Sequence, residues 1–192
     1  MIPQLPRDQG CSSTLTSLFD DLQKKGYTGE LTTSESARIL ASNDNSIWEQ
    51  MPSAIITPKT TQDVSILLEL LSNTKYKSLH IAPRGGGTST AGQSITESLT
   101  LDCKQFLNRI LDIDIEQKQV RVECGVVLAT LNCELAKLGL MIGPTVATAD
   151  RATIGGMIGN DSAGKGSLVY GKMSDCVVSL RTVLRGGVVW DS

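Results

Sequence analysis

The 192-residue sequence has only 4% aromatic residues and a single histidine, and its five cysteines form no CxxC pair. Without clustered cysteines or histidines, neither a zinc site nor an iron–sulfur cluster is expected. The formal net charge of −2 gives no general basic surface, so nucleic acid is not an expected partner. No apolar run reaches the length of a membrane span, and the N-terminus lacks the basic and apolar regions of a signal peptide. These absences predict a cytoplasmic protein without a transmembrane segment or a bound metal.

The sparse reactive side chains are expected to be structural. The cysteines are Cys11, Cys103, Cys124, Cys133 and Cys176. Their odd number and irregular spacing predict reduced thiols, mostly packed as small apolar residues. His80 lies in a short apolar segment, where a packed histidine is expected rather than a catalytic base.

Short apolar segments alternate with amphipathic ones, which predicts an α+β fold. Helices are expected over 12–25 and 127–138, a helical turn over Glu35–Ala41, and one helix that begins at Thr60 or Thr61 and buries Val64, Leu67, Leu68 and Leu71. Strands are expected over 54–57, 79–82, 98–102, 107–113, 119–123, 177–184 and 188–190. The first two strands and the helix between them form a βαβ unit with parallel strands, and residues 107–123 form an antiparallel hairpin.

The most informative stretch is Leu79–Gln93, in which an apolar strand runs into three glycines, Gly85–Gly87. Glycines can adopt positive φ, and successive backbone N–H groups in such a turn form a concavity that suits an anion. Arg84, Thr88 and Ser89 add side-chain donors for phosphate oxygens. Because the loop follows the carboxyl end of a parallel strand, we favour a diphosphate cradle over a flexible surface loop. The middle glycine is then expected to lie where the backbone almost touches the diphosphate.

Two common phosphate motifs do not fit the glycines. The dinucleotide fingerprint G-x-G-x-x-G fails at Thr90, which stands at its third glycine position. Residues 159–165 satisfy G-x-x-x-x-G-K, but Gly166 stands where a P-loop needs a magnesium-binding Ser or Thr. A third arrangement does fit: one glycine loop holds a diphosphate, and a second, from Thr153 to Gly164, runs along the rest of a long cofactor.

In this arrangement the sequence resembles the flavin-binding domain of the vanillyl-alcohol oxidase and p-cresol methylhydroxylase superfamily, known as a PCMH-type domain. The residues that carry the resemblance are Pro83–Thr88 with Gly92 for the first loop, Thr153–Gly156 with Asn160, Gly164, Tyr170 and Gly171 for the second, and Pro52–Pro58 for the entry strand. Asp44-Asn45-Ser46 is similar to the D-2-hydroxyacid dehydrogenase branch, which includes the D-2-hydroxyglutarate and D-lactate enzymes.

The resemblance implies FAD as the cofactor. The implied binding residues are Arg84, Gly85, Gly86, Gly87, Thr88, Ser89, Gly92, Gln93, Pro144, Thr153, Gly155, Gly156, Asn160, Ser162, Gly164, Tyr170 and Gly171. Some branches attach the flavin through a histidine just after the first glycines. Thr88 and Ser89 occupy that position here, so non-covalent binding is expected.

The resemblance also implies a domain plan. Residues 1–50 are expected to form an N-terminal helical extension, and 51–192 a PCMH-type domain that is incomplete at its C-terminus. Its first subdomain, about 51–105, holds the parallel βαβ unit, and its second, about 106–192, a mixed or antiparallel sheet.

Two functions stay open. The chain is the FAD-binding portion of an enzyme that oxidises a D-2-hydroxy acid by hydride transfer to flavin N5, or a non-catalytic flavin module that completes its site with a partner chain. In the first case, the family's catalytic histidines and substrate-binding arginines would lie in a further C-terminal part, so no catalytic residue is assigned here.

Overall fold

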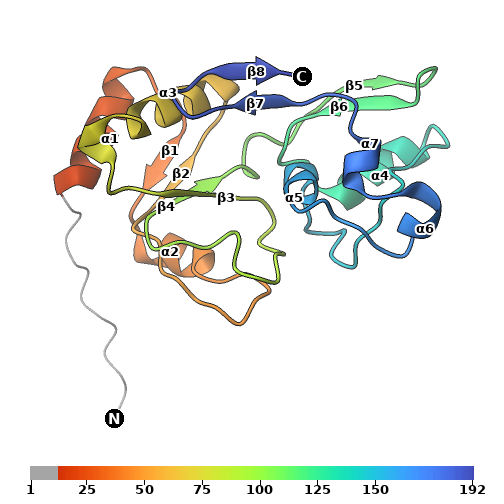
Figure 1. The fold of residues 1–192 in the computed structure, drawn as a ribbon, viewed down its shortest axis with the longest axis horizontal. Coiled ribbons are helices and arrows are strands. Elements are labelled where there is room, and N and C mark those ends of the chain that lie inside the picture. The colour runs from red at the N-terminus through yellow and green to blue at the C-terminus, as the bar shows by residue number, and fades with distance from the viewer. Residues whose placement is uncertain (1–12) are drawn as a thin grey trace, which may run out of the picture.

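A computed structural model describes residues 13–192 of the chain (Figure 1). The elements in chain order are α1 (Ser13–Lys24), β1 (Glu30–Thr32), α2 (Glu35–Ala41), β2 (Ala54–Thr57), α3 (Thr61–Leu71), η1 (Thr74–Tyr76), β3 (Ile81–Arg84), β4 (Leu99–Asp102), β5 (Ile110–Asp114), β6 (Gln119–Val122), α4 (Leu128–Ala136), α5 (Ile154–Gly159), α6 (Ser167–Tyr170), α7 (Met173–Cys176), β7 (Arg181–Val183) and β8 (Val189–Asp191).

The first half of the chain is built on a four-stranded sheet with the order β1-β2-β4-β3. Strands β2 and β3 both run parallel to β4, as the βαβ prediction requires, but β4 lies between them. Helices α1 and α3 pack on one face of the sheet, where Leu18, Leu67 and Leu99 are fully buried in one apolar cluster. Helix α2 lies on the other side of the sheet (Figure 1). The three parallel strands therefore end together, and the glycine loop leaves that end of β3.

Helix α3 starts as predicted, at a capping box in which Thr60 and Asp63 bond reciprocally. Its buried face was predicted only in part: Leu67 is fully buried, and Val64 and Leu71 pack half-buried against the same core. The residues inside are Asp63, Ile66, Leu67 and Leu70, whereas Leu68 is only half-buried. Both stripes have the helical spacing i, i+3, i+4, i+7 and differ by one residue. Asp63 begins the true stripe because its carboxylate, 1% exposed, accepts hydrogen bonds from the N–H groups of Thr28 (2.7 Å) and Lys59 (2.9 Å).

The described part of the expected N-terminal extension joins this same sheet and core. Strand β1, which the sequence analysis missed, pairs antiparallel with β2 and places Leu31 opposite Ile56. Three residues are too few to show the alternation by which a strand is recognised.

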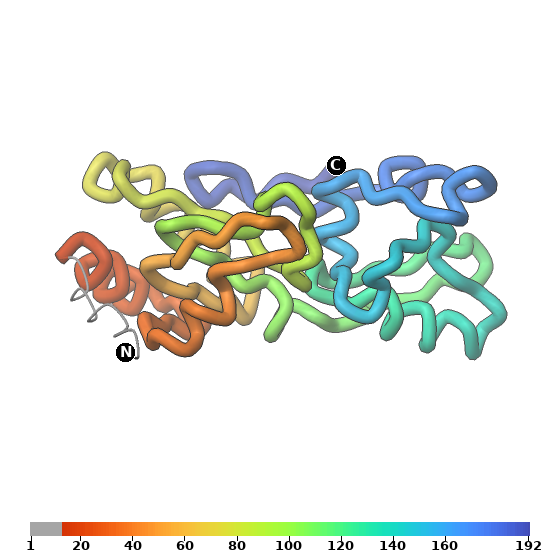
Figure 2. Tube along the Cα trace, turned by 90° about the horizontal axis from the view of Figure 1, so that it is seen from below, coloured from red at the N-terminus to blue at the C-terminus, as the bar shows by residue number. Residues whose placement is uncertain are grey.

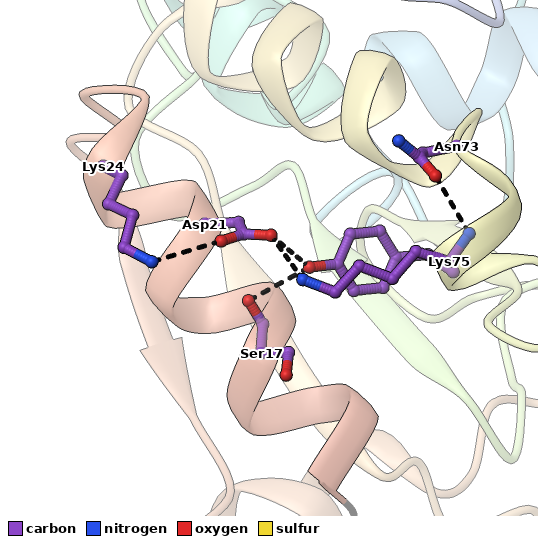
Figure 3. A network of polar contacts seen from close by, with 6 residues as sticks. Ser17, Asp21, Lys24, Asn73 and Lys75 are labelled. Atoms are coloured by element: carbon purple, nitrogen blue, oxygen red, sulfur yellow. Dashed lines mark hydrogen bonds and ion pairs between the residues drawn. The ribbon is translucent and has the colours of Figure 1, made fainter.

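Helix α1 ends at Lys24, one residue before the expected end, and Gly26 beyond it has a φ of 82°. Figure 3 shows how this helix is attached to η1. The Tyr76 hydroxyl lies 2.6 Å from Asp21 Oδ2 and 3.1 Å from the Ser17 carbonyl oxygen, and Lys75 Nζ lies 2.7 Å from the same carboxylate. Hydrogen bonds from Lys75 and Tyr76 lower the pKa of Asp21 to about 2.

The second half of the chain has its own core, formed by α4, α5, α7 and the segment before α5. The predicted antiparallel hairpin is confirmed as β5–β6. The helix expected over 127–138 is α4, in which Leu128, Leu131 and Leu135 are buried, but Leu138 lies beyond the end of the helix and is 42% exposed. Figure 2 shows the two halves side by side along the long axis of the molecule.

The last two strands connect the halves. The two strands expected over 177–184 and 188–190 are β7 and β8, which pair antiparallel, although β7 is shorter than expected. The turn between them reaches α3, where Ser65 Oγ donates to the Gly187 carbonyl oxygen (Figure 1).

Three expectations about single elements and side chains need correction. The strand predicted over 79–82 is β3 at Ile81–Arg84, which leaves His80 exposed just before the strand. Of the four described cysteines, only Cys103 is half-buried, and Cys124, Cys133 and Cys176 are exposed. Cys11 lies outside the described residues. Within residues 13–192, no helix combines the length and apolarity that crossing a bilayer requires.

Candidate functional site

The first glycine loop follows β3 directly, at the carboxyl end of the parallel strands. Only Gly87 of the three consecutive glycines has a positive φ (63°), and Gly92 has another (77°). Gly85 and Gly86 therefore do not use the positive φ that glycine allows. These two positions require glycine for a different reason, which is the closeness of the second loop.

The two glycine loops lie against each other. Arg151 Nη2 donates to the Gly86 carbonyl oxygen (3.2 Å). Further along, Gln93 Nε2 donates to Asn160 Oδ1 (3.4 Å). A Cβ atom added at Gly86 would collide with the Arg151 carbonyl oxygen, and one added at Gly85 would collide with Thr153 Oγ1. We expected a side chain at Gly86 to strike a bound ligand, but it would first strike the neighbouring loop.

The backbone N–H groups of the first loop are free to bind an anion. Among residues 13–192, no N–H group from Gly85 to Ser89 donates to another backbone group. Gly87 and Ser89 are nonetheless buried, and Gly85, Gly86 and Thr88 are half-buried. Unpaired N–H groups in such surroundings are costly unless an acceptor fills their concavity. A diphosphate supplies several acceptor oxygens, so this loop fits the phosphate part of a dinucleotide cofactor.

At the start of α5 (Ile154–Gly159), the first N–H groups of the second loop are already paired. Thr153, 2% exposed, caps α5 by accepting from the Gly156 N–H (3.3 Å). The N–H groups of Ile154 and Gly155 donate to the carbonyl oxygens of Val126 and Cys124, each at 2.8 Å. Gly155 fits there only because a Cβ atom would press on Cys124. This loop is therefore a fixed wall beside the first loop rather than a second row of free donors.

Two predicted phosphate donors point elsewhere. Arg84 Nη2 donates to the Asn43 carbonyl oxygen (2.7 Å), and the Ser89 hydroxyl donates to Asp44 Oδ2. Burial lowers the pKa of the Arg84 guanidinium, an effect that the Asp44 carboxylate opposes. Burial alone would raise the pKa of Asp44, but hydrogen bonds from Ser46, Ser89 and Ser94 outweigh it and hold this pKa below its usual value. The side chains of Arg84 and Ser89 thus hold the loop instead of extending into its concavity.

The remaining predicted residues form a second group around α6. Gly164 packs on the Thr145 carbonyl oxygen, and Tyr170 packs on Gly143 beside the buried Pro144. Gly171 has a φ of 76°. Ser162 is tied into the backbone, since its N–H donates to the Met157 carbonyl oxygen (2.9 Å) and its own carbonyl accepts from Met173 (3.1 Å). The structure brings the predicted residues at 84–93 together with those at 153–160. The group around α6 lies apart from them, further along the second half of the chain.

Sequence reasoning missed two residues that contact the first loop. Arg151 precedes the recognised glycine pattern, and its guanidinium bonds to the loop backbone. Asp44 was noticed only as part of a family signature, and nothing in the sequence indicates that its carboxylate reaches Ser89, 45 positions later. Both contacts depend on how the two halves fold around the loop.

Comparisons with known proteins agree with this geometry. The family described as FAD binding domain matches residues 52–192. The D-2-hydroxyglutarate dehydrogenases of Pantoea ananatis and Escherichia coli are 43% and 41% identical over 192 residues, the whole of this chain but 19% of each relative. The glycolate oxidase subunit GlcD of Bacillus subtilis is 33% identical over 141 residues, 73% of this chain and 29% of that relative.

Among solved structures, an alkyldihydroxyacetonephosphate synthase matches 88% of this chain and 36% of its own with a TM-score of 0.76 at 23% identity. A Physcomitrella patens BBE-like 1 variant matches 91% of this chain and 37% of its own with a TM-score of 0.74 at 22% identity. Such low identity supports the fold alone, and the α+β, PCMH-type architecture expected from the sequence is confirmed.

Proposed function

This chain belongs to the family of FAD binding domains, and from that premise we propose that it is the FAD-binding part of a dehydrogenase for a D-2-hydroxy acid. The observation that carries the proposal is the row of free N–H groups from Gly85 to Ser89, held against a second glycine loop. FAD is the cofactor of this family, and its diphosphate has the charge and the acceptor oxygens that such a row binds.

In this proposal the chain itself binds and orients the cofactor. The N–H groups of Gly85–Ser89 hold the diphosphate, and the wall formed by Thr153–Asn160 lies along the rest of the molecule. Arg151, whose guanidinium already lies on the Gly86 carbonyl oxygen, adds a positive charge beside the diphosphate. Bound FAD supplies a hydride acceptor at N5 of its flavin ring.

Binding in this proposal is non-covalent. Thr88 and Ser89 stand just after the glycines, and the hydroxyl of Ser89 is engaged with Asp44. Neither residue is a histidine that could attach a flavin ring.

The substrate class comes from the relatives. A D-2-hydroxyglutarate class substrate is favoured because those enzymes match along the whole of this chain, whereas the glycolate oxidase subunit matches a shorter part. Since the chain spans 19% of those relatives, we place the substrate-binding groups and the general base outside it. The exposed His80 at the start of β3 is not assigned to that role. A cytoplasmic location is part of the same proposal.

Flavin selectivity tests the binding part of the proposal. The purified chain is titrated with FAD and with riboflavin, which lacks the diphosphate, while flavin fluorescence is followed. We expect FAD to bind at least about tenfold more tightly, because charge-assisted hydrogen bonds to the diphosphate exceed about 1.4 kcal/mol together. Equal affinities for FAD and riboflavin would refute the assignment of the first loop as a diphosphate cradle. After acid precipitation, free flavin in the supernatant is expected, and colour in the pellet would contradict non-covalent binding.

Dye reduction tests where the reacting groups lie. With FAD and D-2-hydroxyglutarate added, the isolated chain should reduce no dye above a control without protein. Reduction that depends on the D enantiomer would show that the chain contains its own base and substrate-binding groups.

A further inference from the structure

Residues 43–48 precede the part of the chain that matches the FAD binding domain family, yet they hold the first glycine loop. The Asp44 carboxylate is the centre of this contact. Its Oδ2 atom accepts hydrogen bonds from the hydroxyls of Ser89 and Ser94, the latter at 3.2 Å. Its Oδ1 atom accepts from the Ser46 N–H (2.8 Å), which fixes the carboxylate in its own turn.

The same segment also holds the start of the loop. Arg84 Nη2 donates to the Asn43 carbonyl oxygen (2.7 Å), and Arg84 Nη1 lies 3.4 Å from Ser94 Oγ. On the far side of the loop, Trp48 lies so close to Gly92 that an added Cβ atom would be 3.3 Å from its Cδ1 atom. Residues 43–48 therefore contact the beginning, the middle and the end of the loop.

The chemistry of the contact requires a carboxylate. Ser89 and Ser94 are 9% and 8% exposed, and their hydroxyls lie 3.2 Å apart. Oδ2 accepts from both hydroxyls while Oδ1 accepts from the Ser46 N–H, so both oxygens act as acceptors. An amide in this place would set a donor against one of these donors. Because the Ser89 hydroxyl proton points to Asp44, the Ser89 backbone N–H is left as the group that faces an anion. The Arg84 guanidinium offsets the negative charge of Asp44 next to the diphosphate position.

We propose that Asp44 is a positioning residue for the cofactor diphosphate, acting through Ser89 and Ser94. The inference rests on the proposed FAD function and deepens it by assigning a role to a residue outside the matched family region. Without the carboxylate, the buried hydroxyls lose their shared acceptor and the N–H groups of Gly85–Ser89 lose their fixed direction. FAD should lose affinity, whereas a ligand without a diphosphate should not.

The test compares Asp44→Asn with Asp112→Asn, which makes the same charge change at an exposed position on β5. Fluorescence titration gives the affinities for FAD and riboflavin, and thermal unfolding without flavin gives the melting temperature. We expect Asp44→Asn to weaken FAD binding about tenfold, in the range of one charge-assisted hydrogen bond, and to leave riboflavin binding near that of the parent. The melting temperature should fall by about 2–4 °C, because Ser89 and Ser94 keep each other as hydrogen-bond partners. Asp112→Asn should match the parent in every measurement.

The outcomes separate the two proposals. If the parent does not prefer FAD over riboflavin, the proposed function fails and this inference fails with it. If the parent prefers FAD and Asp44→Asn keeps that preference, only the role of Asp44 is refuted. Equal weakening of both flavins would also refute it, because that pattern indicates a general structural loss.

A second variant covers the case in which Asp44→Asn does not fold. Ser89→Ala removes the hydroxyl through which Asp44 acts but keeps the backbone N–H. It should also weaken FAD selectively, and unchanged FAD affinity in Ser89→Ala would overturn the inference.

Discussion

A methyl group at Gly85 probes the contact between the two glycine loops. In Gly85→Ala the new Cβ atom would collide with Thr153 Oγ1 and lie 3.2 Å from the Thr153 Cβ atom. Thr153 cannot rotate away freely, because it is 2% exposed and its hydroxyl caps α5. We therefore expect Gly85→Ala to lower the free energy of unfolding by about 2 kcal/mol, the usual cost of overpacking.

Removing the Thr153 hydroxyl should relieve this collision. Thr153→Ala by itself costs about 1 kcal/mol, since α5 loses its N-cap. If the two effects were independent, the double variant would lose about 3 kcal/mol. Because the atom that causes the collision is gone, we expect a loss of only about 1 kcal/mol, which is a coupling energy of about 2 kcal/mol.

Urea unfolding of the flavin-free protein measures all four members of this cycle. Gly159→Ala is the matched control, because no atom lies within 4 Å of its added Cβ atom. Gly159→Ala should change the free energy of unfolding little, and its effect should add to that of Thr153→Ala in the double variant. Additive losses for Gly85→Ala and Thr153→Ala would refute the contact, and with it the site formed by two adjacent loops.

Three further predictions concern stability and reactivity. Asp63→Ala should lower the free energy of unfolding by about 3 kcal/mol in urea titrations, since several buried donors lose their shared carboxylate. Hydrogen bonds from Thr28, Lys59 and Thr60 outweigh burial and lower the pKa of Asp63, so the difference between parent and Asp63→Asn should be full above about pH 4 and shrink as the pH falls below it. Iodoacetamide mapped by mass spectrometry should label Cys133 before Cys103, because a hydrogen bond with Cys124 and burial raise the pKa of the Cys103 thiol.

The sequence predicts most elements of the fold because their signals are local. The capping residues of α3, the glycine at the end of α1 and the turn of the β5–β6 hairpin all lie within or beside their elements. The buried face of α3 was predicted one residue too far along the chain, because a carboxylate begins it and apolar spacing alone selects the neighbouring stripe. The charged residue is buried there because the distant Thr28 donates to its carboxylate in addition to the nearby Lys59 and Thr60.

The candidate site was also predictable only where its signals are local in the sequence. Consecutive glycines after a strand indicate a close approach of backbone, and the structure shows that closeness. What the sequence does not reveal is which residues the loop approaches. Gly86 faces Arg151, just ahead of the second loop, and Arg84 and Ser89 bond to residues 43 and 44. These contacts join segments more than 40 residues apart, and no local pattern encodes them.

The central claim is that FAD binds where the two glycine loops meet. A titration of the isotope-labelled chain with FAD, followed by amide chemical shifts, tests it directly and detects weak binding as well as tight binding. If FAD binds there, the largest changes fall at the N–H groups of Gly85–Ser89 and smaller ones at Thr153–Asn160. Riboflavin should not reproduce the changes at Gly85–Ser89. Changes confined to other segments such as the β5–β6 hairpin, or no changes at millimolar FAD, would contradict it.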